Sequence, residues 1–134
     1  MAVSLRTLPS QTSNIMKQFI TINMKDNKLI AEFWGMVLGE DGTMYYDDVE
    51  NLFPPTPTDK LKFDTEWNWL MPVVEKIEEQ HGCDFIASKR RATRTYDANF
   101  MDEVNNYVVY VEDCKDRQEA TYKAVVEFIK QHNK

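Results

Sequence analysis

Cysteine and glycine are both scarce in this sequence. Its two cysteines, Cys83 and Cys114, have no CxxC spacing, so neither a disulfide scaffold nor a zinc ribbon is indicated. Its four glycines are scattered singly and form no loop of the kind that cradles a phosphate. No segment approaches the roughly 18 apolar residues of a membrane span, and residues 1–18 lack the pattern of a secretory leader. We therefore expect a soluble, cytoplasmic protein without membrane association.

Basic residues are outnumbered by acidic ones, since 16 Lys and Arg against 22 Asp and Glu give a net charge of −6. This balance disfavours sequence-blind binding to nucleic acid or anionic lipid, so any such contact must be local. Hydrophobic residues make up 43% of the 134 positions, which is enough for one core. Residues 1–14 are rich in Ser, Thr, Pro and Asn. We expect a disordered tail there, followed by a single domain over residues 15–134.

The first half of that domain shows a helix, a hairpin and a loop. An apolar stripe predicts a helix over residues 26–34 that ends at Gly35. Apolar residues 36–38 and 43–45 flank a turn-rich tetrapeptide, which predicts a small hairpin. Three prolines between residues 54 and 57 remove backbone donors, so we expect a semi-rigid loop over residues 52–59.

A second helix is predicted from a cap at Asp64 to Gly82. Its apolar stripe consists of Trp67, Leu70, Met71, Val74 and Ile77. Pro72 interrupts the pattern, so we expect either a kink or two short helices.

The last third of the chain predicts two strands and a helix. Residues 84–96 and 107–112 have strand character, with a loop over residues 97–106 between them. A final helix begins near Asp116, which has capping-box spacing to Glu119. Together the elements predict an α+β fold, in which a small, mainly antiparallel sheet carries three helices on one face.

Three helical segments carry a family resemblance. They read NKLIAEF at residues 27–33, WNWLMPVVEKIE at 67–78 and ATYKAVVEFIK at 120–130. In these segments the chain resembles small uncharacterised proteins from bacteriophage and prophage regions of gut Bacteroidetes. The resemblance implies a phage-related origin and assigns no chemistry to any residue.

No catalytic constellation emerges from the sequence. His81 and Cys83 stand two residues apart across a glycine, without the surroundings of a known thiol nucleophile. The acidic turn around Gly42 fails the register of a calcium loop. We therefore expect no enzymatic activity, no cofactor and no bound metal.

The basic segment at residues 89–94 is one candidate binding site, because it places four cations within six residues of an acidic chain. As a continuous strand it would present Arg90, Arg94 and Tyr96 on one face. Arginines beside an aromatic ring suit phosphates and unstacked bases. The candidate residues for a nucleic-acid or nucleotide ligand are Lys89, Arg90, Arg91, Arg94 and Tyr96. The alternative is an exposed strand whose charges pair with nearby carboxylates.

Aromatic residues around the proline loop form a second candidate, because a small domain has limited room to bury them. The candidate contact residues are Trp34, Tyr45, Tyr46 and Phe53. Our leading hypothesis is a non-enzymatic accessory protein of phage type that contacts a protein partner or itself through this surface. The alternative is a nucleic-acid or nucleotide binder that uses the basic segment.

Overall fold

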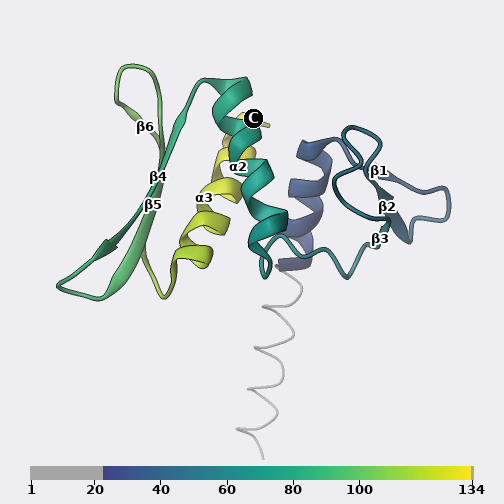
Figure 1. Cartoon of the computed structure of the whole chain (residues 1–134), viewed down its shortest axis with the longest axis horizontal. Helices are drawn as coiled ribbons and strands as arrows, with labels where there is room; N and C mark the ends of the chain where they lie inside the picture. Colours follow the sequence, from purple (N-terminus) through teal and green to yellow (C-terminus); the bar gives the residue numbers. More distant parts are fainter. Residues whose placement is uncertain (1–22, 134) are drawn as a thin grey trace, which may run out of the picture.

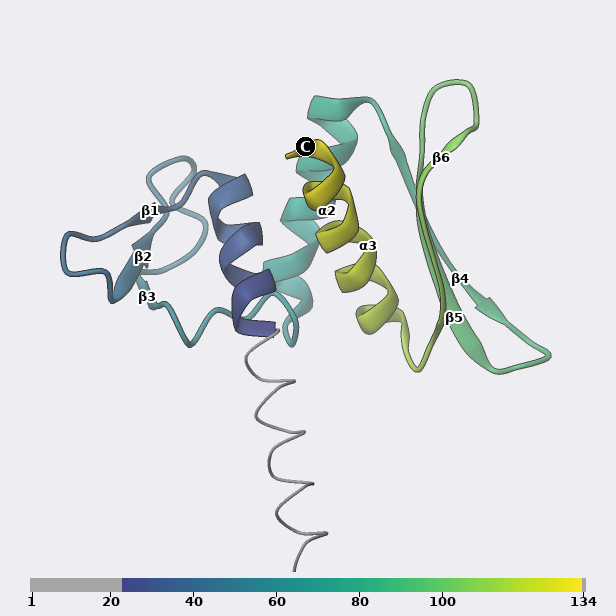
Figure 2. The same cartoon turned by 180° about the vertical axis from the view of Figure 1, so that it is seen from behind.

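The computed structural model describes residues 23–133, so the predicted tail over residues 1–14 and the predicted domain start at residue 15 lie outside it. The described residues form three helices and two three-stranded antiparallel sheets (Figure 1). The predicted α+β class is therefore confirmed. The strands divide into two sheets in place of the single predicted one. In two opposite views the helices lie between these sheets (Figures 1 and 2).

The first helix (residues 23–34; purple in Figure 1) leads into the smaller sheet. It ends at Gly35, whose φ of 102° places it in the left-handed region that glycine enters without strain. The predicted hairpin is confirmed as β1 (Val37–Leu38) and β2 (Met44–Tyr46).

The proline loop departs from its prediction, because part of it joins the smaller sheet. Its residues Thr56–Pro57 form β3, which pairs with β2 at the edge. An edge position tolerates proline, since a donor missing on the open side breaks no ladder bond. In the turn between β2 and β3, the Asp47 carboxylate accepts hydrogen bonds from the backbone N–H groups of four residues: Val49, Glu50, Leu52 and Phe53.

Helix α2 (Trp67–His81) is one continuous helix through Pro72, in place of two short ones, and ends at Gly82 in the left-handed region. The predicted cap at Asp64 is wrong. Residue 66 occupies the N-cap position, while Asp64 accepts a hydrogen bond from Asn27 of the first helix at 3.1 Å. This bond joins the entry of α2 to the first helix.

The larger sheet consists of β4 (Asp84–Arg90), β5 (Thr95–Met101) and β6 (Tyr107–Cys114), in that order. The prediction of one strand over residues 84–96 and a loop over 97–106 is wrong. Residues 91–94 make a turn, and most of the supposed loop belongs to the central strand β5. The turn contains neither glycine nor proline, and Arg94 supplies the positive φ of 58° that it requires.

Helix α3 (Arg117–His132) packs on one face of this larger sheet (Figure 1). Its predicted N-terminus is confirmed, since the Asp116 carboxylate accepts a hydrogen bond from the backbone N–H of Glu119 at 2.8 Å. Phe128 of α3 packs on Phe100 of β5 with ring centroids 5.4 Å apart. The face of the sheet toward α3 is thus part of the core.

Candidate interaction surface on the larger sheet

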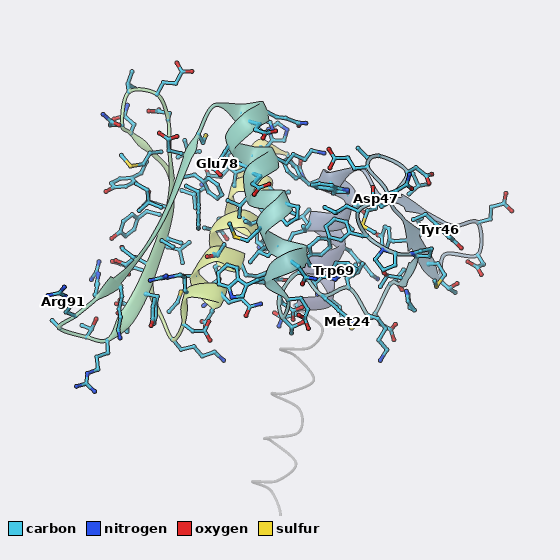
Figure 3. All side chains as sticks on the ribbon, in the orientation of Figure 1. Met24, Tyr46, Asp47, Trp69, Glu78 and Arg91 are labelled. Atoms are coloured by element: carbon cyan, nitrogen blue, oxygen red, sulfur yellow. The ribbon has the colours of Figure 1, made fainter. Side chains whose placement is uncertain are left out.

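The face of the larger sheet that points away from α3, called the outer face below, carries a mixed set of side chains (Figure 3). Opposed residues of neighbouring antiparallel strands share a face, so the strand registers define it. Its central row is Ile86, Asn99 and Tyr110, and the next row is Asp84, Met101 and Tyr107. Arg90, Asp97 and Glu112 meet at one end of it.

A network of hydrogen bonds and ion pairs occupies this end of the outer face. The Arg90 guanidinium donates from Nε to Asp97 Oδ2 at 2.7 Å and from Nη2 to Glu112 Oε2 at 2.8 Å. Tyr110 Oη lies 3.2 Å from Arg90 Nη2 and donates to Asp97 Oδ2 at 3.1 Å. The arginine is thus engaged from two strands, and the network fixes the ring of Tyr110 over the sheet.

Asp97 is the buried centre of this network, with 5% of its surface exposed. Burial alone would raise the pKa of its carboxyl group. Hydrogen bonds from Arg90, from the Asp113 N–H and from Tyr110 outweigh burial, so the pKa of Asp97 is lowered. The carboxylate therefore stays ionised and holds Arg90 at neutral pH.

Asn99, in the central row, is a polar side chain of the outer face with a buried oxygen atom that lacks a partner. It is only 7% exposed, and its Oδ1 atom has no hydrogen-bond partner among the described residues. Its cross-strand neighbours are Ile86 and Tyr110, which are 46% and 43% exposed. An unmatched buried carbonyl of this kind destabilises a fold by about 1–3 kcal/mol.

Tyr107 extends the apolar part of the outer face. It is 60% exposed, and its ring packs edge-to-face on Tyr110 with centroids 5.1 Å apart. The outer face thus combines exposed aromatic and aliphatic surface with an unmatched amide. Tyrosines in such positions are frequent anchors of protein interfaces.

The predicted arrangement of the basic segment is wrong. Strand β4 ends at Arg90, and Tyr96 stands opposite Lys89 on the face toward α3, so Arg90 and Tyr96 lie on opposite faces. Lys89 Nζ lies 5.7 Å from the centroid of the Tyr96 ring. Arg91 and Arg94 are exposed at the β4–β5 turn, where Figure 3 shows Arg91 at the tip.

The predicted aromatic contact surface is also wrong. Trp34, Tyr45 and Phe53 are buried, with 3%, 3% and 4% of their surfaces exposed. They belong to the core beneath the smaller sheet, where Phe53 packs against Trp69 of α2 at a centroid distance of 4.7 Å. Tyr46, at 40% exposure, remains at the surface.

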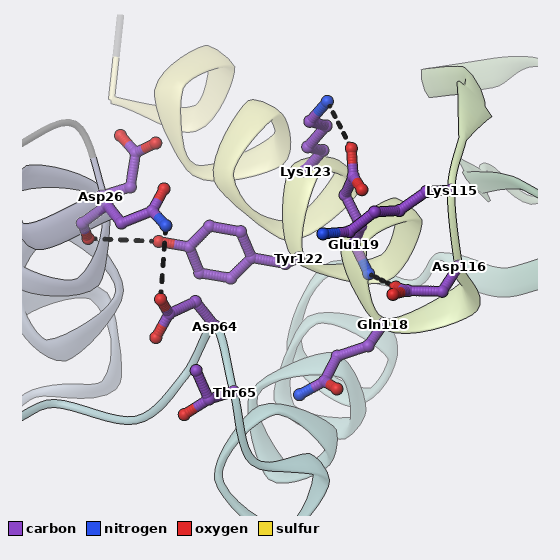
Figure 4. A pocket seen from close by; sticks show the side chains of 10 residues that line it. Asp26, Asp64, Thr65, Lys115, Asp116, Gln118, Glu119, Tyr122 and Lys123 are labelled. Carbon is purple, nitrogen blue, oxygen red and sulfur yellow. Dashed lines mark hydrogen bonds and ion pairs between the residues drawn. The ribbon is translucent and has the colours of Figure 1, made fainter. Parts of the chain in front are cut away.

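A hollow of about 470 Å³ lies between the first helix, the segment before α2 and the start of α3 (Figure 4). Some of its polar groups bond to neighbouring residues, whereas the buried Nε2 atom of Gln118 has no hydrogen-bond partner among the described residues. Tyr122 Oη donates to Asn27 Oδ1 at 3.0 Å, and Lys123 pairs with Glu119 at 3.0 Å. The Tyr122–Asn27 bond ties α3 to the first helix, whereas the Lys123–Glu119 pair lies within α3. Burial raises the pKa of the Tyr122 phenol, which therefore stays protonated.

The two cysteines of the described chain are free thiols, and both are buried. Burial raises the pKa of Cys83 and of Cys114, which is the reverse of what an activated nucleophile requires. The His81 ring packs on His132 with centroids 4.6 Å apart. Over residues 23–133, no three His, Cys, Asp or Glu side chains gather as metal ligands, and no helix is long and apolar enough to cross a membrane.

Comparison with known proteins adds no relative: no family model, no curated protein and no solved structure matches this chain. The resemblance to phage-region proteins stays a prediction.

Sequence reasoning missed the members of the outer face other than Arg90. The alternation of DFIASKR at residues 84–90 and TYDANFM at 95–101 is the signal that could have revealed them.

Proposed function

We propose that this protein is a non-enzymatic interaction protein that binds a partner protein through the outer face of the larger sheet. The observation that carries the proposal is Asn99, a buried amide with an unmatched Oδ1 between exposed Ile86 and Tyr110. Because the Oδ1 atom is covered by its own neighbours, a partner would have to displace the side chains of Ile86 or Tyr110 to bring an N–H or O–H donor to it, and would then satisfy the amide and cover those neighbours.

The Arg90 network supports the same proposal because it gives the outer face a fixed shape. The ring of Tyr110 is held through its hydroxyl to Asp97 and Arg90, so it loses little rotamer freedom when a partner packs on it. An anchored tyrosine beside a second exposed tyrosine, Tyr107, forms a preorganised contact point.

The alternative function, a nucleic-acid or nucleotide binder at residues 89–94, has weaker support. Arg90 is engaged by two carboxylates, and Lys89 is directed over Tyr96. Exposed Arg91 and Arg94 remain at the turn. On a chain of net charge −6, these two cations contribute little electrostatic attraction to the phosphates of a nucleic acid.

The test compares variants at matched positions on the two sheets. Immobilised protein captures partners from a lysate of the organism that encodes it, and each captured protein is then purified and titrated by calorimetry. Asn99→Leu removes the amide at nearly constant volume and leaves the partner's donor unmatched, so we expect affinity to fall at least about tenfold, or about 1.4 kcal/mol. Because the change also removes an unmatched buried carbonyl, the stability of the free protein should stay equal or rise.

Tyr107→Ala should weaken binding as well, whereas Tyr46→Ala is the control, since Tyr46 is a comparably exposed tyrosine on the smaller sheet. Unchanged affinity in Asn99→Leu and Tyr107→Ala, or a loss confined to Tyr46→Ala, would refute the outer face as the site. Saturable binding of single-stranded DNA or RNA at low salt that is lost in Arg91→Glu/Arg94→Glu would favour the alternative.

A further inference from the structure

Strand β4 lies at an edge of the larger sheet, since the strand order is β4-β5-β6. All of its residues, Asp84–Arg90, pair with β5 without a break in register. The opposite edge strand, β6, has two irregularities in its register, and its Asp113 has a positive φ of 61°. Bulges and twists of this kind protect an edge from pairing with another strand, and β4 has none.

The hydrogen bonds of β4 show which of its backbone groups point outward. The carbonyl of Arg90 accepts from the Arg94 N–H across the turn, so Arg90 directs its backbone groups toward β5. The Phe85 N–H donates to the Glu78 carboxylate of α2, at 3.4 Å, on the other side of the strand, so a strand added at this edge must displace Glu78 from that N–H. Because directions alternate along a strand, Ala87 and Lys89 also direct their N–H and C=O groups to the open edge.

We propose that β4 pairs with β4 of a second copy of this chain, antiparallel and about a two-fold axis at Ala87. This register sets Ala87 against Ala87 of the second copy and Ile86 against its Ser88. At each end it sets Asp84 against Arg90 of the other copy, whose guanidinium already bonds Asp97 and Glu112 of its own sheet, so this pair adds no net attraction. A shift by two residues in either direction leaves part of each strand unpaired. The register at Ala87 is therefore the one that pairs β4 along its whole length.

The side chains of β4 leave room for that neighbour. Ala87 is small, and at the axis it faces Ala87 of the second copy. The Lys89 ammonium is directed back over the Tyr96 ring of its own sheet, so it is withdrawn from the edge. Ile86 is 46% exposed and lies beside the axis on the outer face, where the second copy would cover part of it.

The contact is a single strand edge and is smaller than the roughly 1,600 Å² of a standard interface, so the dimer is weak. Sedimentation velocity of the full chain from about 10 µM to about 1 mM spans the range in which such a contact dissociates. We expect the weight-average mass to rise toward that of a dimer. A monomer at every concentration refutes the proposal.

Ala87→Pro is the decisive variant, because it removes an N–H that points to the open edge and leaves the β4–β5 ladder intact. We expect it to abolish the dimer at an unchanged melting temperature. Ala87→Val retains the N–H and should retain the dimer. Dimerisation that survives Ala87→Pro would place the contact elsewhere.

A cross-link tests the register and does not depend on how the proline variant folds. In the proposed pair the two Ala87 Cα atoms lie about 5.5 Å apart, within disulfide range, so Ala87→Cys should form a covalent dimer on mild oxidation. Ser88→Cys is the control, since Ser88 is the more exposed residue but faces Ile86 of the second copy. The native cysteines are both buried.

Equal cross-linking of the two cysteine variants would indicate random collision and refute the register. A monomeric chain that instead captures an extended peptide along β4 would replace the second copy by a peptide ligand. The proposal does not rest on the proposed function: Asn99→Leu tests the outer face, and Ala87→Pro tests the edge.

Discussion

Helix α2 contains two tryptophans that differ sharply in burial. Trp69 is 7% exposed, and its ring lies 4.7 Å from Phe53 and 5.2 Å from Phe63, measured between centroids. Trp67 begins the same helix and is 39% exposed. Because both residues are tryptophans of the same helix, their alanine variants form a matched pair that measures how much the aromatic cluster contributes to the free energy of unfolding.

Truncation of Trp69 to alanine removes the full side chain from a packed core. Changes of this kind lower the free energy of unfolding by about 3–5 kcal/mol. For Trp67, only the buried part of the ring contributes. Full burial of a large side chain is worth about 1.5–3 kcal/mol, and alanine regains roughly 0.5 kcal/mol of helix propensity. We therefore expect Trp67→Ala to lower the free energy of unfolding by about 1 kcal/mol.

Urea titration followed by far-UV circular dichroism measures both variants without relying on tryptophan fluorescence. The expected difference between Trp69→Ala and Trp67→Ala is at least about 2 kcal/mol at a common m-value. Equal losses, or a larger loss in Trp67→Ala, would show that the stripe through Trp69 is not the core side of α2. The packing of the smaller sheet on this helix would then be wrong as well.

Two further predictions concern ionisable groups. Asp47→Ala should lower the free energy of unfolding by about 2 kcal/mol, because it leaves buried N–H groups such as that of Phe53 without a hydrogen-bond acceptor. A loss below about 0.5 kcal/mol in urea titration would contradict this prediction. Burial and the neighbouring cationic groups lower the pKa of His81 in the folded chain. The His81 imidazole therefore binds a proton more readily in the unfolded chain, and the free energy of unfolding should decline as pH falls through about 6.5. His81→Phe should remove this decline between pH 7.5 and about 5.5; an unchanged pH profile would assign the decline to another group.

Local signals predicted the parts of the fold that local interactions determine. The cap of α3 needs only Asp116 and the N–H of Glu119, and the end of α2 needs only a residue that accepts a positive φ at Gly82. Both were readable from the sequence because the partners lie within a few residues of each other.

Contacts between distant segments explain the errors. Trp67 and Trp69 both fit an amphipathic helix, and Trp69 is buried because Phe53 and Phe63, from the preceding loop, pack on it. The burial of Trp34 depends on the same cluster, since its ring lies 5.3 Å from that of Phe53. The periodicity within one helix contains no information about those partners.

The missed strand β5 has a different cause, and it bears on the proposed site. As the central strand, β5 buries Ala98 and Phe100 toward α3, yet its buried outer residues are the polar Asp97 and Asn99. Polar residues at alternate positions weaken the sequence signal for a buried strand, which is why this segment looks like a loop. Hydrogen bonds from Arg90 and Tyr110 satisfy the buried Asp97 carboxylate. The Asn99 Oδ1 atom has no hydrogen-bond partner within the described chain. A leucine at Asn99 would suit both the strand and its apolar neighbours, so folding alone does not account for the amide. Binding at the outer face would account for it, because a partner's donor can supply the bond that the free chain lacks.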